Sequence, residues 1–179
     1  GIGDAIMNRL DKAAGHHTIQ ATDITKLQKY RRVLFISKSD NCRGPMAAEL
    51  LRNESLEQEY LIGSRGMVVL FPEPANQKAE AIMRCHQMTL AEHEAKQLDE
   101  EDLDEDTLIL TFEEAQKWKI VSDYENVKHV YTLNEYIDDE RVVNSAHGQP
   151  LNVYGENFEL LRELIHKLAE RLNEEARSK

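Results

Sequence analysis

The residues best suited to chemistry lie in one short segment, between an apolar run and the start of a helix. Ser37 ends the apolar run, five residues follow, and Arg43 stands two positions before Pro45. Backbone N–H groups in such a loop point inward, and with the positive end of the helix dipole they form an anion site. An arginine that closes the loop grips two phosphate oxygens at once. The spacing therefore predicts a phosphate- or oxyanion-binding loop, which consists of Lys38, Ser39, Asp40, Asn41, Cys42, Arg43 and Gly44.

Short apolar runs alternate with amphipathic helices from residue 32 onward, and these elements must position the loop. The expected strands are residues 33–36, 60–62, 107–110 and 129–133. The expected helices are residues 45–51, 74–88, 113–120 and 155–176, the second with Ala79, Ile82, Cys85 and His86 inward and the last with Phe158, Leu161, Leu164, Ile165, Leu168 and Leu172 inward. The uninterrupted apolar residues at 33–36 indicate a strand that is buried on both faces. The alternation predicts a parallel sheet with right-handed crossovers and helices on both faces.

Several segments resemble, in order, the low-molecular-weight protein tyrosine phosphatase family. They are Arg43, Pro45, Met46, Ala47 and Glu49, then Ser64 and Gly66, Glu73-Pro74-Ala75, Asp106–Thr111, Thr132–Tyr136 and Tyr154-Gly155. The resemblance covers about residues 32–176. It implies a three-layer, doubly wound α/β fold whose four-stranded parallel sheet has the order 2-1-3-4. In that family the loop opens with a nucleophilic cysteine thiolate, and a separate carboxylic acid protonates the leaving oxygen.

The chain departs from the family at the positions that carry catalysis. Ser37 stands at the nucleophile position, and Asn152 stands at the position of the general-acid aspartate. Gly44 replaces the serine that stabilises the thiolate, and Asp40 replaces a neutral asparagine that braces the loop. A serine hydroxyl has a far higher pKa than a thiol, and an amide cannot deliver a proton. Taken together, these departures predict a loss of catalysis.

Other residues around the loop give weaker signals. Ser39 replaces a glycine of the family, which predicts strain at a position suited to positive φ. Cys42 is a candidate substitute nucleophile, but a role as a small apolar residue is favoured, and Cys85 is expected to be buried in its helix. Phe71 and Tyr154 are candidate aromatic walls of the mouth of the site.

The resemblance and the departures leave three functions open. The leading hypothesis is a catalytically inactive phosphatase-like protein (a pseudophosphatase) that binds an oxyanion, a phosphoprotein or a protein partner. The alternative is a bacterial phosphatase that hydrolyses phosphotyrosine or phosphoarginine in proteins and carries a Cys-to-Ser change at Ser37. In the third, the domain is a structural appendage of a larger polypeptide. No cofactor and no metal are expected.

Composition limits the possible partners. The chain has 179 residues, 41% of them hydrophobic, which suits one domain at residues 32–179 after a helical extension or linker at residues 1–31. Ile2, Ile6 and Leu10 share one helical face of that extension and could dock on a protein partner. The net charge of −11 argues against nucleic acid and anionic membranes as partners. The two cysteines and the lack of a long apolar run are typical of a cytoplasmic protein.

Two further features are expected to be structural. The acidic run from Leu98 to Asp106 holds seven Asp and Glu residues, which is typical of a solvated helix and turn. Trp118, the single tryptophan, is expected to be buried or half-buried by packing on its helix.

Overall fold

A computed structural model describes residues 28–178 of the chain, so the expected helical face of Ile2, Ile6 and Leu10 lies outside the described residues. The strands are β1 (Arg32–Ser37), β2 (Leu61–Gly66), β3 (Thr107–Thr111) and β4 (Val130–Thr132). The helices are α3 (Arg43–Arg52), α4 (Gln77–Cys85), η1 (Glu100–Asp102, a 3-10 turn), α5 (Glu114–Asp123), α6 (Leu133–Ile137) and α7 (Leu151–Arg177). All strand pairs are parallel and the sheet order is β2-β1-β3-β4, which confirms the predicted fold class.

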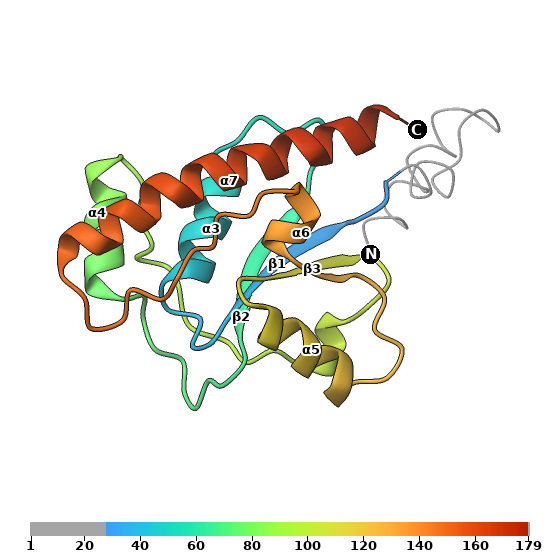
Figure 1. The fold of residues 1–179 in the computed structure, drawn as a ribbon, viewed down its shortest axis with the longest axis horizontal. Coiled ribbons are helices and arrows are strands. Elements are labelled where there is room, and N and C mark those ends of the chain that lie inside the picture. Colours follow the sequence, from blue (N-terminus) through green and yellow to red (C-terminus); the bar gives the residue numbers. More distant parts are fainter. Residues whose placement is uncertain (1–27, 179) are drawn as a thin grey trace, which may run out of the picture.

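Helices α7 and α5 lie on opposite sides of the sheet (Figure 1). An apolar core lies on each face of the sheet. Val33 and Phe35 of β1 face the larger core, which they share with α3, α4, α6 and α7. Leu34 and Ile36 face the smaller core, which they share with Ile120 of α5. None of these four strand residues is more than 1% exposed, so the prediction of a strand buried on both faces is confirmed. Within residues 28–178, no helix is both long and apolar enough to span a membrane.

Helix α7 is the longest element and lies across the larger core (Figure 1). All six side chains expected to face inward are at most 1% exposed: Phe158, Leu161, Leu164, Ile165, Leu168 and Leu172. Burial of a leucine-sized side chain stabilises a protein by about 1.5–3 kcal/mol. The helix begins at Leu151, earlier than expected, because Pro150 takes the N-cap position and suits the start of a helix.

Helix α4 differs most from its prediction. It begins at Gln77, because the Asn76 side chain accepts hydrogen bonds from the amides of Lys78 and Ala79 at 2.8 and 3.2 Å. The helix ends at Cys85, which is exposed, so the prediction of a buried Cys85 is wrong. Met83 is the fully buried residue of the last turn instead.

Two other expectations also differ from the structure. Strand β2 extends to Gly66, well beyond the predicted residues 60–62, because it pairs with β1 at six positions despite its glycines. Trp118 of α5 is 57% exposed, so the expected packing against the core is wrong.

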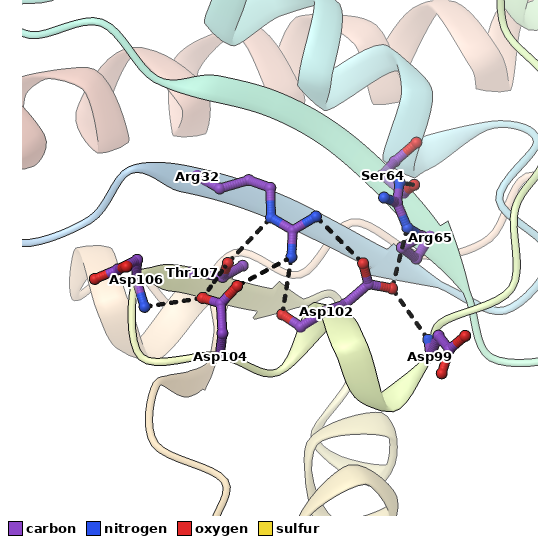
Figure 2. A network of polar contacts seen from close by, with 8 residues as sticks. All are labelled: Arg32, Ser64, Arg65, Asp99, Asp102, Asp104, Asp106 and Thr107. Carbon is purple, nitrogen blue, oxygen red and sulfur yellow. Dashed lines mark hydrogen bonds and ion pairs between the residues drawn. The ribbon is translucent and has the colours of Figure 1, made fainter. Parts of the chain in front are cut away.

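The acidic run is part of an ion-pair network rather than a purely solvated segment (Figure 2). The Asp102 carboxylate accepts hydrogen bonds from Arg32 Nη1 at 3.3 Å, from Arg65 Nε at 3.1 Å and from the amide of Asp99 at 3.0 Å. Asp102 is only 5% exposed. Because Arg32 belongs to β1 and Arg65 to β2, this one carboxylate links two strands to the segment before β3.

Candidate functional site at the carboxyl end of β1

The predicted loop lies at the carboxyl edge of the parallel sheet, between the end of β1 at Ser37 and the start of α3 at Arg43. Ligands of open α/β sheets bind at this edge. Backbone hydrogen bonds fix the loop to its surroundings: the amides of Met67 and Val68 donate to the carbonyls of Ser37 and Lys38, both at 2.9 Å. The side chain of Lys38 is exposed. The loop is therefore held in one shape by the chain that follows β2.

Ser37 lies at the base of the loop and is 4% exposed. Its Oγ accepts a hydrogen bond from the amide of Asp40 at 3.2 Å, the one hydrogen bond that its hydroxyl makes among residues 28–178. Neither a histidine nor a lysine of the described part bonds to this oxygen. The hydroxyl thus remains without an acceptor for its own proton.

Asp40 forms the tight turn of the loop. Its φ of 55° lies in the left-handed region, which Asp tolerates better than most residues, whereas Ser39 has no positive φ. The strain predicted at Ser39 is therefore found one residue later. The Oδ2 atom accepts a hydrogen bond from the amide of Lys96 at 2.9 Å, and Nε2 of His93 lies 2.6 Å from the carbonyl oxygen of Asp40.

The Asp40 carboxylate is completely buried, and its Oδ1 atom has no hydrogen-bond partner within the described residues. Burial raises the pKa of this carboxyl group. The Ser64 hydroxyl, the Lys96 amide and the charges of His93 and Arg65 oppose that rise in pKa. The loop therefore contains a carboxylate that is costly to ionise.

Gly44 lies beside the Ser37 hydroxyl and the Asp40 carboxylate, each of which lacks one hydrogen-bond partner among the described residues. A Cβ atom at this position would lie 3.2 Å from Ser37 Oγ and 3.4 Å from Asp40 Oδ1. Both oxygens therefore face the same small space, next to the Cα atom of Gly44. A hydroxyl-bearing side chain at position 44 would be within reach of both.

Arg43 is held at the edge of the sheet by partners far away in sequence. Its Nη2 pairs with Glu113 Oε2 at 2.9 Å, and its Nη1 donates to the carbonyl oxygen of Val143 at 3.0 Å. The guanidinium also lies over the ring of Phe112, at 5.4 Å from the centroid, and the residue is 5% exposed. Sequence reasoning missed these partners, although Glu113 lies two residues after the end of β3, the strand beside β1, which places it near the loop.

The remaining loop side chains take supporting positions. Asn41 donates from Nδ2 to Glu73 Oε1 at 3.0 Å, which ties the loop to the segment before α4. Burial raises the pKa of the Cys42 thiol to about 11, against the opposing effect of the Arg43 charge. At neutral pH Cys42 is therefore a thiol and not a thiolate, in keeping with its role as a small apolar residue.

The expected acid and wall residues lie on α7 and on the segment between β2 and α4. Asn152 lies exposed in the first turn of α7. Tyr154 is 2% exposed, and its hydroxyl lies 3.3 Å from Nδ2 of Asn76, so its ring belongs to the core rather than to an open wall. Phe71 is 65% exposed on the segment between β2 and α4.

The structure is a doubly wound α/β domain with a loop between the carboxyl end of β1 and the start of α3. The family model described as "Low molecular weight phosphotyrosine protein phosphatase" matches residues 32–179, so the chain belongs to this family. A protein-arginine-phosphatase of Geobacillus stearothermophilus is 30% identical over 146 residues, covering 80% of this chain and 97% of that protein.

Two solved structures illustrate the range of relatives. The low-molecular-weight protein tyrosine phosphatase from T. tengcongensis has a TM-score of 0.72 and 32% identity, and the match covers 78% of this chain and 97% of that one. The YwlE arginine phosphatase, as a cysteine-to-serine mutant with a phosphorylated active-site serine, has a TM-score of 0.74 and 25% identity. That match covers 83% of this chain and 99% of the other.

Proposed function

We propose that this protein is a pseudophosphatase that binds an oxyanion or a phosphorylated protein at the loop and does not turn it over. The observation that carries the proposal is Ser37, a buried serine at the end of β1, where the resemblance to the family leads us to expect a nucleophilic cysteine. A serine hydroxyl stays protonated at neutral pH unless a base removes its proton, whereas a cysteine in the same field ionises.

The residue at the general-acid position also supports a loss of catalysis. The chain can be aligned with the family's Asp-Pro pair in two ways, and both lead to this conclusion. Counting back from Tyr154 and Gly155 gives Asn152, as expected from the sequence. Matching the family's Asp-Pro pair to Pro150, which caps α7, gives Gln149 instead. Both residues carry an amide, which cannot protonate a leaving group.

Retained binding is supported by the groups that surround the loop. Glu113 and the Val143 carbonyl hold the Arg43 guanidinium at the edge of the sheet. The loop amides lie at the N-terminus of α3, where a helix favours an anion. The relatives are named as phosphatases of tyrosine and arginine, which supports a phosphoprotein as the ligand class.

A thermal-shift titration with phosphate, vanadate and tungstate at constant ionic strength tests this proposal. A ligand at about 100 times its dissociation constant stabilises the folded state by about 2.7 kcal/mol, which raises the melting temperature measurably. Arg43→Ala should abolish the shift, whereas Arg84→Ala, which removes the same charge from an exposed site on α4, should retain it. Arg43→Lys serves the same purpose if the alanine variant is unfolded, because lysine cannot grip two oxygens.

Two results would contradict the proposal. One is the absence of any shift in the wild-type protein. The other is a shift of equal size in the wild-type and Arg43 variants, because the oxyanion would then bind elsewhere.

A second candidate is a tyrosine or arginine phosphatase that carries a Cys-to-Ser change at Ser37. The YwlE mutant with its phosphorylated serine favours it, because that relative combines the same fold with a serine at its active site. Ser37→Cys decides between the two candidates. We expect little or no hydrolysis of an aryl phosphate or phosphoarginine by this variant, because neither Asn152 nor Gln149 can protonate the leaving group. Robust turnover would favour the second candidate.

A further inference from the structure

We propose that Asp40 acts as a general base for Ser37, so that the loop accepts a phosphoryl group on Ser37 in a single, stoichiometric step. The inference rests on the proposed function, because it requires a phosphoryl compound to bind in the loop. It adds an activity to that site, because a phosphoryl group is transferred to Ser37 but is not hydrolysed afterwards.

The geometry that points to this role is a hydroxyl group, that of Ser37, whose proton has no acceptor among the described residues, close to a carboxylate oxygen, Asp40 Oδ1, that accepts no hydrogen bond there. The Ser37 hydroxyl oxygen accepts a hydrogen bond from the Asp40 amide. No acceptor for the hydroxyl proton is found among residues 28–178. Asp40 Oδ1 has no donor in hydrogen-bonding geometry within the same part of the chain, although the Ser64 hydroxyl is near enough to favour the ionised carboxylate. Both oxygens approach the position of a Gly44 Cβ, at 3.2 and 3.4 Å. Catalytic hydrogen bonds are often long before a ligand binds and shorten in the complex.

The neighbouring groups contact Oδ2 of Asp40, so Oδ1 is the carboxylate oxygen that accepts no hydrogen bond among the described residues. The Lys96 amide occupies Oδ2 at 2.9 Å, and His93 Nε2 lies 3.7 Å from that same oxygen. Ser64 and Arg65 of β2 are the other polar groups near Asp40, and both favour its ionised form. Burial has the opposite effect and raises the pKa of the carboxyl group, which makes the carboxylate a stronger base.

Ser37 Oγ forms a bond to phosphorus while the bond from phosphorus to the leaving group breaks, and the leaving group departs with the electron pair. The hydroxyl proton passes to Asp40 Oδ1, which neutralises the carboxylate and removes its repulsion of the phosphoryl oxygens. Because the acid position carries an amide, the donor must have a leaving group that needs no proton. An acyl phosphate, which releases a carboxylate, meets this requirement.

The product is expected to persist. Hydrolysis of a phosphoserine would expel a serine alkoxide, a far poorer leaving group than the thiolate of the family's enzymes. The reaction therefore ends at one phosphoryl group per chain.

Acetyl phosphate is the probe for the test, and mass spectrometry of the intact chain and of its peptides is the readout. We expect one phosphoryl group on Ser37 in the wild-type protein and none at that position in Ser37→Ala. Asp40→Asn should slow phosphorylation about 100-fold, a typical contribution of a general base. The same variant should bind vanadate more tightly, because a negative charge is lost. Glu101→Gln, which removes an exposed carboxylate outside the loop, should leave the rate unchanged.

The opposite directions of rate and affinity in Asp40→Asn separate a base from a merely structural residue, which would weaken both. If that variant does not fold, the wild-type pH profile serves instead: the rate should rise as Asp40 loses its proton, and a flat profile would overturn the proposal. Equal rates in Asp40→Asn and wild type would also overturn it. Oxyanion binding without phosphorylation refutes this inference and leaves the binding function standing, whereas the absence of both refutes both.

Discussion

Asp40 and Asp102 are both buried carboxylates, 0% and 5% exposed, yet their surroundings differ sharply. Asp102 accepts hydrogen bonds from two arginines and one backbone amide, which occupy both of its oxygens (Figure 2). Asp40 Oδ2 accepts one amide hydrogen bond and lies 3.7 Å from His93 Nε2, whereas Oδ1 has no partner in hydrogen-bonding geometry within the described chain. Buried polar groups are almost always satisfied, so an unsatisfied one calls for an explanation. Asp102 therefore stabilises the fold, whereas the incomplete hydrogen bonding of Asp40 is the basis of the role proposed for it in the loop.

The largest expected effect is at Asp102. Asp102→Ala would leave Arg32 and Arg65 without their shared buried partner, and such a loss costs about 3–5 kcal/mol of the free energy of unfolding. Urea unfolding of the variant and the wild type measures the difference. If the free energy of unfolding falls by less than about 1 kcal/mol, the level of an exposed ion pair, Asp102 does not stabilise the fold more than a surface carboxylate would, and its difference from Asp40 is lost.

At Asp40 we expect a substitution to raise, rather than lower, the free energy of unfolding. Asp40→Asn should raise the free energy of unfolding by about 1–2 kcal/mol at neutral pH, because an incompletely satisfied buried charge is removed. The pKa of Asp40 is raised on folding, so the wild type binds its proton more tightly when folded than when unfolded. Its stability is therefore greatest, relative to the variant, below the unfolded pKa of 3.8, and it declines as pH rises through the folded pKa.

Urea unfolding of both proteins across this pH range checks the sign. A variant that is less stable than the wild type at neutral pH, or a difference that does not change with pH, would contradict the expectation.

A smaller effect is expected at Gly44. Gly44→Ser would place a hydroxyl between Ser37 Oγ and Asp40 Oδ1 and supply the missing donor, worth about 1 kcal/mol. The new Cβ would also lie 3.2 Å from the Ser64 Cβ, so Ser64 must shift slightly. Thermal unfolding measures the gain, and Gly44→Ala is the matched control that adds the Cβ without the hydroxyl. Equal stability of the two variants would mean that Oδ1 does not use the new donor.

The smallest effect is expected at Glu101, one residue before Asp102. Its side chain is exposed and belongs to the same acidic run, so Glu101→Ala should change the free energy of unfolding by less than about 0.5 kcal/mol. Urea unfolding in parallel with Asp102→Ala provides the measurement. A loss comparable to that of Asp102→Ala would show that the whole acidic run, and not one buried carboxylate, stabilises the sheet.

The fold was predictable because its signals are local. Apolar residues at 33–36 and the inward face of residues 158–172 follow from periodicity, and both are buried as expected. The element boundaries and Cys85 were less predictable. They depend on the Asn76 cap and on which side of a short helix meets α7, and neither is encoded in periodicity alone.

By itself, the sequence determined the parallel sheet and the position of the loop between Ser37 and Arg43, because each depends on residue type and short-range spacing. Only the tertiary structure decided which charges are buried and what they touch. Asp102 looks like any other residue of an acidic run until Arg32 and Arg65 meet it from neighbouring strands. The free oxygen of Asp40 emerges in the same way, because burial and hydrogen bonding depend on segments brought together by folding rather than on neighbours in the chain.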